Sequence, residues 1–198
     1  MKNYAMYVLD TETTSLDHTV GDVIELSISR MGYDEIKTWH IKPSNPDGID
    51  PGALRVNGHK LEDLLWKTEE GKVKYRLASE VIVEVENFLL DDGLPTLNRI
   101  LVAHNAGFDK TYLEQLWKKA GSAETFPFGR RIIDTSSIEF FLDLCTDEDN
   151  MAQGYSLSNL GKKYGIKNDK AHTAEADTKT LKAIFEKQIE SFKKALKK

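Results

Sequence analysis

The chain has 198 residues, of which 40% are apolar, so its length suits one domain of ordinary size that folds without covalent cross-links. Its 27 lysines and arginines are outnumbered by 32 aspartates and glutamates, and the net charge of −5 argues against a general polycationic nucleic-acid binder. An enzyme that acts on nucleic acid is not excluded, because bound cations reverse the local charge of a site. The single cysteine, Cys145, excludes an intramolecular disulfide and a multi-cysteine zinc site.

No apolar run approaches the roughly 20 residues that span a bilayer, and the N-terminus shows no signal-peptide pattern. We therefore expect a cytoplasmic protein with no membrane partner.

The first part of the chain has the patterns of strands. Residues 4–10 form a short apolar run of strand formers, residues 22–31 alternate apolar and polar as in a half-buried strand, and residues 36–41 return after a turn. These three segments predict an antiparallel meander. Residues 43–52, with three prolines and two glycines, form the clearest loop.

The remainder alternates helical and strand patterns. Apolar residues at helical spacing predict helices over residues 54–65, 78–90, 107–120, 135–144, 156–164 and 174–196. Short strands are predicted at 100–103 and 131–134, a polar surface excursion at 67–75, and an acidic loop at 146–154. This order predicts an α/β fold with a mixed sheet flanked by helices, in a single domain over residues 1–198.

Asp10 and Glu12 are the first chemical signal. They lie two residues apart at the end of a buried strand, so their side chains share one side. Two carboxylates there repel each other and lose hydration, which is tolerated when a cation or a proton offsets the charge. The alternative is a strand end that opens into solvent.

Three further residues lie where helices begin. Asp109 falls in the first turn of the helix after the fourth strand, Asp177 lies near the start of the last helix, and His172 precedes it in a loop. Taken singly, the two aspartates are explained by the helix dipole and the histidine by ordinary solvation.

Together these positions indicate one site. Strand ends and helix starts of α/β folds converge on one rim, where active sites form. Four carboxylates are a ligand set for hard divalent cations, and two such ions about 4 Å apart clamp the attacking and leaving oxygens of a phosphodiester. His172 has a suitable reference pKa for the base that deprotonates water.

Three segments resemble the motifs of the DnaQ-like 3′–5′ exonucleases, in the DEDDh branch of the DEDD superfamily. They are DTETTSL at 10–16, HNAGFD at 104–109 and HTAEAD at 172–177, supported by IDT at 133–135 and YSLSNL at 155–160. The resemblance extends from about residue 7 to residue 181. It implies a ribonuclease-H-like mixed sheet of five strands, three antiparallel and then two parallel.

The resemblance also implies roles. Asp10 would bridge two divalent cations, Mg²⁺ or Mn²⁺ as its substitute; Glu12 and Asp177 would complete one metal site, Asp109 would serve the other, and His172 would be the general base. The sister branch has tyrosine where this chain has Thr173, which indicates the histidine branch. Two departures are Ser15, where the family usually has glycine, and Thr178, where it often has alanine.

Other residues are candidates for substrate contacts. The backbone at Glu12 and Thr13 is expected to meet the 3′-terminal sugar. Leu16 either wedges against the terminal base or packs in the ordinary way, and Asn105 either orients the substrate or Asp109, or caps a helix. The remaining histidines, at 18, 40, 59 and 104, have no partner pattern in the sequence and are expected to be surface or structural residues.

The expected function is release of nucleoside 5′-monophosphates from the 3′ end of single-stranded or frayed DNA, as in proofreading or repair, with a DNA polymerase as a possible partner. One alternative is an exoribonuclease acting on RNA or short oligoribonucleotides. The other is a non-catalytic nucleic-acid-binding module, which is expected to lack at least one of the five site residues. All five are present.

Overall fold

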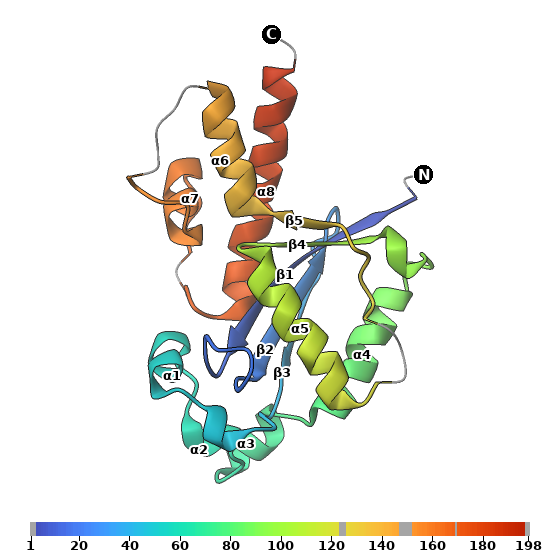
Figure 1. Cartoon of the computed structure of the whole chain (residues 1–198), viewed down its shortest axis with the longest axis vertical. Coiled ribbons are helices and arrows are strands. Elements are labelled where there is room, and N and C mark those ends of the chain that lie inside the picture. Colours follow the sequence, from blue (N-terminus) through green and yellow to red (C-terminus); the bar gives the residue numbers. More distant parts are fainter. Residues whose placement is uncertain (1–2, 123–125, 147–151, 169, 197–198) are drawn as a thin grey trace.

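The computed structural model describes residues 3–122, 126–146, 152–168 and 170–196, which are arranged around a mixed sheet (Figure 1). Its strands are β1 (Ala5–Thr13), β2 (Val23–Arg30), β3 (Ile36–His40), β4 (Arg99–Ala103) and β5 (Ile132–Asp134), in the order β3-β2-β1-β4-β5. β2 pairs antiparallel with β1 and β3, whereas β4 pairs parallel with β1 and β5. The predicted sheet of three antiparallel and then two parallel strands is confirmed.

Helices cover both faces of this sheet (Figure 1). α4 (Ala78–Leu90) and α5 (Ala106–Ala120) cover one face, and α8 (Ala174–Ala195) covers the other. α6 (Thr135–Thr146) and α7 (Leu157–Tyr164) pack on α8. The short helices α1 (Pro51–Asn57), α2 (Leu61–Leu64) and α3 (Glu69–Lys74) lie together beyond β2 and β3.

Successive side chains of β1 point to opposite faces of the sheet and so belong to two separate parts of the core. Tyr7 and Leu9 point toward α4 and α5 and belong to the larger apolar cluster. Val8, one residue out of phase, packs with Leu181 and Phe185 of α8. Because side chains of a strand alternate between faces, Asp10 and Glu12 lie on the same face as Val8, under α8.

Local signals set several helix ends. Gly121 adopts the left-handed conformation (φ 66°) that ends α5, and the Ser156 hydroxyl accepts a hydrogen bond from the Asn159 N–H at the start of α7. Thr173 caps α8 in the same way, with its hydroxyl accepting from the Ala176 N–H.

The helix predicted over residues 54–65 is wrong, because Gly58 adopts a left-handed conformation (φ 74°) that ends α1 and separates it from α2. The segment 67–75, predicted as a surface excursion, contains α3. It is anchored by two residues that its polar composition conceals: Gly71 is buried against the backbone of Asp63, and Tyr75 is 1% exposed.

The strand predictions need two corrections. β1 does not end at Asp10 but continues to Thr13, because Glu12 and Thr13 still pair with β2. β2 is not half-buried: its polar residues Glu25 and Ser27 are buried as completely as its apolar ones, because α8 covers them.

Most of the predicted acidic loop at 146–154 lies outside the described residues, since 147–151 are not among them. Within the described residues, no helix combines the length and apolarity needed to cross a bilayer.

Candidate active site

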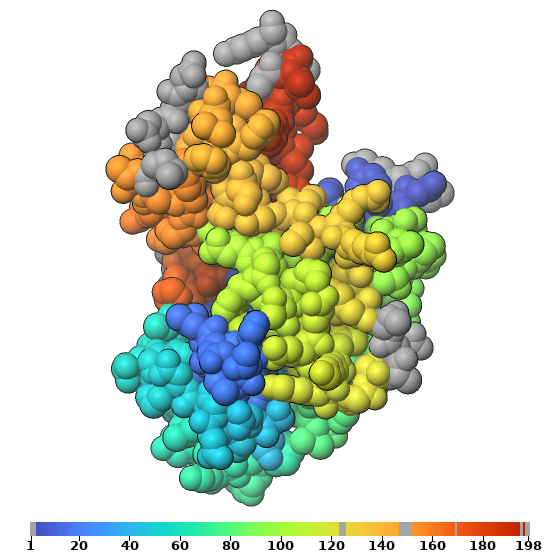
Figure 2. All heavy atoms as spheres, in the orientation of Figure 1, coloured from blue at the N-terminus to red at the C-terminus, as the bar shows by residue number. Residues whose placement is uncertain are grey.

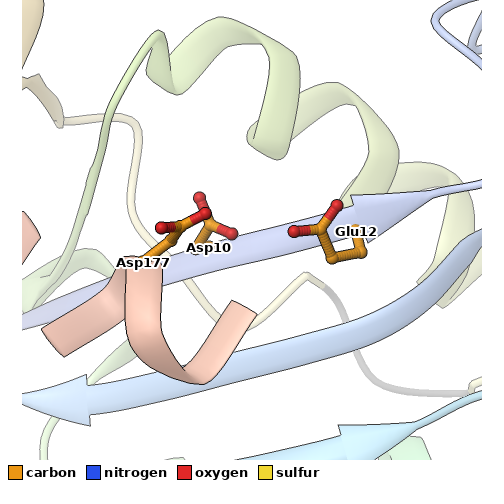
Figure 3. Close-up of side chains that lie close together, drawn as sticks. All are labelled: Asp10, Glu12 and Asp177. Atoms are coloured by element: carbon orange, nitrogen blue, oxygen red, sulfur yellow. The ribbon is translucent and has the colours of Figure 1, made fainter. Parts of the chain in front are cut away.

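Asp10, Glu12 and Asp177 bring their carboxylates together on the α8 side of the sheet (Figure 3). One oxygen from each lies within 4.8 Å of the others. Asp10 and Glu12 come from β1 and Asp177 from the first turn of α8, so residues 165 positions apart in the sequence meet where the helix starts.

The local structure holds each of these side chains. Asp10 and Glu12 are two apart in a paired strand, and the pairing with β2 becomes irregular immediately after Glu12, as bulged strands do beside active sites. Asp177 accepts a hydrogen bond from the Asn168 side-chain amide at 2.5 Å and another from the His172 backbone N–H at 3.0 Å. The loop before α8 thus closes back onto the first turn of the helix.

Burial and like charge disfavour ionisation of the three acids. Burial raises the pKa of Glu12 to about 8, and the charges of Asp177, Glu25 and Asp109 add to the effect. The pKa of Asp10 is held well above its usual range by burial and then by the charges of Asp109 and Asp177. Burial also raises the pKa of Asp177, although the bonds from Asn168 and His172 oppose it.

The donor set fits a hard divalent cation. It consists of carboxylate oxygens only, with no sulfur or imidazole ligand, which is the chemistry of Mg²⁺ and Mn²⁺ sites. Carboxylates that repel one another in a buried position are stabilised when a cation replaces their protons, so this cluster is suited to metal binding.

Asp109 lies beside this group without belonging to it. It is 3% exposed in the first turn of α5, and its Oδ1 accepts a hydrogen bond from the Thr11 hydroxyl at 2.8 Å. Burial raises the pKa of Asp109 to about 7, even though that hydrogen bond favours the charged form. Its charge is the largest electrostatic cause of the raised pKa of Asp10.

His172 is exposed in the loop before α8, where its backbone has a positive φ of 69°. Together with Asp177 it lines a cavity of about 490 Å³ between α7 and the start of α8. Lys162 and Lys167 also line this cavity. Figure 2 shows the surface hollowed between the segment that follows β1 and the segment that leads from α7 to α8.

The candidate substrate contacts differ in their surroundings. The Thr13 side chain is buried and donates a hydrogen bond to the Ser15 carbonyl, and the Thr13 carbonyl accepts one from the Asn57 side-chain amide at 3.1 Å. Leu16 is 83% exposed, so the alternative of ordinary packing is wrong.

Asn105 occupies the N-cap position of α5, as one alternative expected, but in a left-handed conformation (φ 60°) in which its side chain makes no capping bond. Its amide oxygen instead accepts a hydrogen bond from the Ser136 hydroxyl at 3.1 Å.

Several residues around the acids have no signal in the sequence. His40 and His59, expected to be surface or structural residues, both lie beside the Glu25 carboxylate, with Nε2 to Oε2 distances of 3.4 and 3.0 Å. Glu25 lies in the segment 22–31 that was predicted as a half-buried strand, in which polar residues are expected to face solvent. The contacts of Glu25 come from the long-range packing of α8 and of the α1–α3 region, whereas Asn168 reaches Asp177 from nearby in the sequence.

Comparison with known proteins identifies the family. A family model described as RNase_T, exonuclease, matches residues 7–185. DNA polymerase III PolC-type proteins of Staphylococcus aureus and Staphylococcus haemolyticus are 27% identical over 193 residues, which is 98% of this chain but 12% of theirs. The chain therefore spans about an eighth of the length of these relatives.

Solved structures share the fold. The zinc-bound Escherichia coli ExoI–ssDNA complex aligns with a TM-score of 0.75 at 16% identity, covering 96% of this chain and 42% of that one. Exonuclease I from Methylocaldum szegediense aligns with a TM-score of 0.74 at 17% identity, with the same coverage. The family match spans most of the chain, so this protein belongs to the exonuclease family, within the DEDD-type 3′–5′ exonucleases of ribonuclease-H-like fold that its motifs resemble.

Proposed function

We propose that this exonuclease removes nucleoside 5′-monophosphates from the 3′ end of single-stranded or frayed DNA with the help of two divalent cations. The observation that carries the proposal is the meeting of Asp10, Glu12 and Asp177, the last of which lines a cavity together with His172. Neither a structural role nor simple solvation accounts for three mutually repelling carboxylates, one buried and two partly buried, near an exposed imidazole.

The four carboxylates and His172 are proposed to have different roles, metal binding and proton transfer. We propose that Asp10, Glu12 and Asp177 hold one cation, and that Asp109, which is hydrogen-bonded to Thr11 between Asp10 and Glu12 on β1, shares a second one with Asp10. When bound, divalent cations neutralise the phosphodiester, lower the pKa of a bound water and hold the leaving 3′ oxygen.

His172 is proposed to accept the proton of the attacking water. It occupies the histidine position of the DEDDh motif, and its exposed place at the cavity wall leaves its ring accessible to the reacting groups. Assignment to the histidine branch rests on this residue together with Thr173.

The substrate is proposed to enter through the cavity between α7 and α8. Lys162 and Lys167 on its wall are suited to contact backbone phosphates, and Leu16, exposed on the segment after β1, is suited to stack against the terminal base. The backbone at Thr13 and the Asn105 side chain are proposed to orient the last nucleotide.

DNA is favoured over RNA by the comparisons. The relatives are named as DNA polymerases, and one of the solved structures is named as a complex with single-stranded DNA. The PolC-type names also make a DNA polymerase a candidate partner. RNA and short oligoribonucleotides remain the second candidate substrate, because recognition of the 2′-hydroxyl depends on pocket details beyond the acidic cluster.

Product analysis tests this function. The protein is incubated with end-labelled single-stranded DNA, duplex DNA and short RNA, each with Mg²⁺, Mn²⁺ or EDTA. We expect metal-dependent release of 5′-mononucleotides from the 3′ end, fastest on single-stranded DNA. Full activity in EDTA, or cleavage that starts within the strand, would contradict the proposal. Faster cleavage of RNA than of DNA would identify RNA as the preferred substrate.

A further inference from the structure

The face of β2 that lies under α8 is unexpectedly polar. Glu25, Ser27 and Ser29 alternate along this strand, and each is at most 4% exposed. A strand covered on both faces is ordinarily apolar throughout, because buried polar groups are costly unless they are hydrogen-bonded. These three residues therefore need partners. α8 donates a hydrogen bond to the side chains of Glu25 and Ser29 and to the backbone carbonyl of Ser27, whose hydroxyl pairs with that of Thr38 on β3.

The contacts between β2 and α8 form a regular series, which we call the β2–α8 ladder. Its three hydrogen bonds run from the Ala174 N–H to Glu25 Oε1 (2.9 Å), from the Thr178 hydroxyl to the Ser27 carbonyl (3.3 Å), and from Lys182 Nζ to the Ser29 hydroxyl (3.1 Å). Four residues of helix rise about 6 Å and two residues of strand about 6.7 Å, so the two spacings match. The ladder therefore fixes how far along β2 the helix α8 lies.

This register decides whether the acidic cluster forms. β2 is paired with β1 so that Glu25 is opposite Glu12 and Ser27 is opposite Asp10. Asp177 lies on α8 between the first two contacts of the ladder. A slip of one helical turn would move Asp177 by about 5.4 Å, more than the 4.8 Å within which the three carboxylates now lie.

Glu25 makes the contact of the β2–α8 ladder at the start of α8, and its carboxylate also has partners outside α8. Its Oε2 lies 3.0 Å from His59 Nε2 and 3.4 Å from His40 Nε2, and the other ring nitrogen of His59 is 2.5 Å from the Tyr75 hydroxyl. With Oε2 engaged, Oε1 is directed at the first N–H of α8. A carboxylate there also complements the positive end of the helix dipole.

We propose that Glu25, held by His40 and His59, is a positioning residue for the metal site: it anchors the first turn of α8 and so places Asp177 opposite Asp10 and Glu12. This inference rests on the proposed function, because it assumes that the three carboxylates bind a divalent cation. Glu25 touches neither the cation nor the substrate in this role.

A purely electrostatic role makes the opposite prediction. If Glu25 acted only through its negative charge, a variant that keeps the charge would keep the metal affinity, whatever the reach of its side chain. Two variants separate the cases. Glu25→Gln removes the charge but keeps an oxygen at the right reach, whereas Glu25→Asp keeps the charge but withdraws the carboxylate by one methylene.

Mn²⁺ binding is measured from the free-ion signal in electron paramagnetic resonance, on the full chain. For Glu25→Asp we expect binding to weaken about tenfold, the lower end of the range for residues that support metal ligands. For Glu25→Gln, which keeps the acceptor for the Ala174 N–H, we expect a change of about threefold or less. In activity assays we expect Glu25→Asp to need a higher Mn²⁺ concentration for half-maximal activity, with an unchanged KM for the oligonucleotide.

Ile82→Ala is the stability control, because Ile82 is buried in α4 on the opposite face of the sheet. It is expected to lower the Tm without changing Mn²⁺ affinity, which separates positioning from general loss of stability. Glu25→Gln binding as weakly as, or more weakly than, Glu25→Asp would overturn the inference, as would wild-type affinity in Glu25→Asp. Absence of Mn²⁺ binding in the parent protein would instead overturn the proposed function itself.

Discussion

The two faces of the central sheet differ in the chemical character of their side chains. The face under α4 and α5 is closed by large apolar side chains such as Tyr7, Leu9 and Trp117, all nearly inaccessible to solvent. The face under α8 carries a smaller apolar cluster around Val8, and toward the start of the helix it changes to carboxylates and their hydrogen-bond partners.

The difference separates stability from activity within one sheet. Burying apolar surface on the first face lowers the free energy of the folded state, whereas burying mutually repelling carboxylates on the second raises it unless a cation is bound. Proteins accept such costs at functional sites. Changes on the two faces should therefore have opposite effects on stability and on activity, and that contrast can be tested by mutation.

The largest effect is expected for Asp10→Asn. Asp10 is proposed to contact both cations. Loss of its carboxylate should therefore reduce exonuclease activity by about 10⁴-fold or more, because charge neutralisation and water activation both depend on the bound cations. The same change removes a buried, repelling charge, so the Tm of the metal-free protein should rise. Activity assays and thermal melts in EDTA measure the two effects. Asp34→Asn, at an exposed acid after β2, is the control and should change neither.

A smaller loss is expected for His172→Gln. Removing a general base typically costs about 10²- to 10⁴-fold in rate, and because His172 is exposed the Tm should stay within the error of the measurement. Mn²⁺ binding should be retained, since the three clustered carboxylates are unchanged. His18→Gln, at another exposed histidine, serves as the comparison. If His172→Gln turned over substrate as fast as the parent protein, His172 would not be the general base.

On the apolar face the expected pattern is reversed. Ile82→Ala should lower the free energy of unfolding by about 2–5 kcal/mol, because it leaves a cavity in the core between α4 and the sheet. Specific activity well below the melting temperature should stay near that of the parent. Urea unfolding measures the first quantity and a low-temperature activity assay the second. Val73→Ala, at an 81% exposed position, should leave both unchanged. A large fall in activity without a fall in stability would show that the two faces are not independent.

The metal-free protein should become less stable as the pH rises. Glu12 and Asp109 have ordinary pKa values of 4.5 and 3.8 but about 8 and 7 in the folded protein, so between these values the folded state binds more protons than the unfolded state. The free energy of unfolding then falls from about pH 4 to about pH 8. Thermal melts in EDTA across this range, repeated with Mg²⁺, test the sign. Mg²⁺ should restore the stability lost at the upper end, and a metal-free Tm that rises with pH would contradict the assigned repulsion.

The smallest effect is expected for Leu16→Ala. This side chain is 83% exposed, so its removal should change the free energy of unfolding by no more than about 0.5 kcal/mol. If it stacks on the terminal base, the KM for single-stranded DNA should rise several-fold, since base stacking contributes about 1–3 kcal/mol. Steady-state kinetics measure this, and an unchanged KM would assign Leu16 no part in substrate binding.

The sequence predicted the sheet and the three motifs because both depend on local pattern. β1, β4 and α5 follow from apolar runs, and the acids stand at positions where chain order alone brings strand ends and helix starts together. The membership of the exonuclease family was likewise foreseen from the three acidic motifs and confirmed by the family match.

The contacts that organise the site could not be predicted in this way. The alternation of β2 indicated a solvent-facing side, and nothing local shows that α8, about 150 residues later, covers Glu25 and bonds to it. The partners of His40 and His59 are hidden for the same reason, because they come together through tertiary packing. The break at Gly58 was missed because apolar spacing continued across a residue whose left-handed backbone ends the helix.

The most direct test of the proposed metal site is a crystal of the protein soaked with Mn²⁺ and a nucleoside 5′-monophosphate, with anomalous scattering used to locate the ions. We predict one peak enclosed by the carboxylates of Asp10, Glu12 and Asp177, and a second between Asp10 and Asp109 with the phosphate beside it. Crystals that hold the nucleotide but show no Mn²⁺ peak at these carboxylates would contradict the central claim.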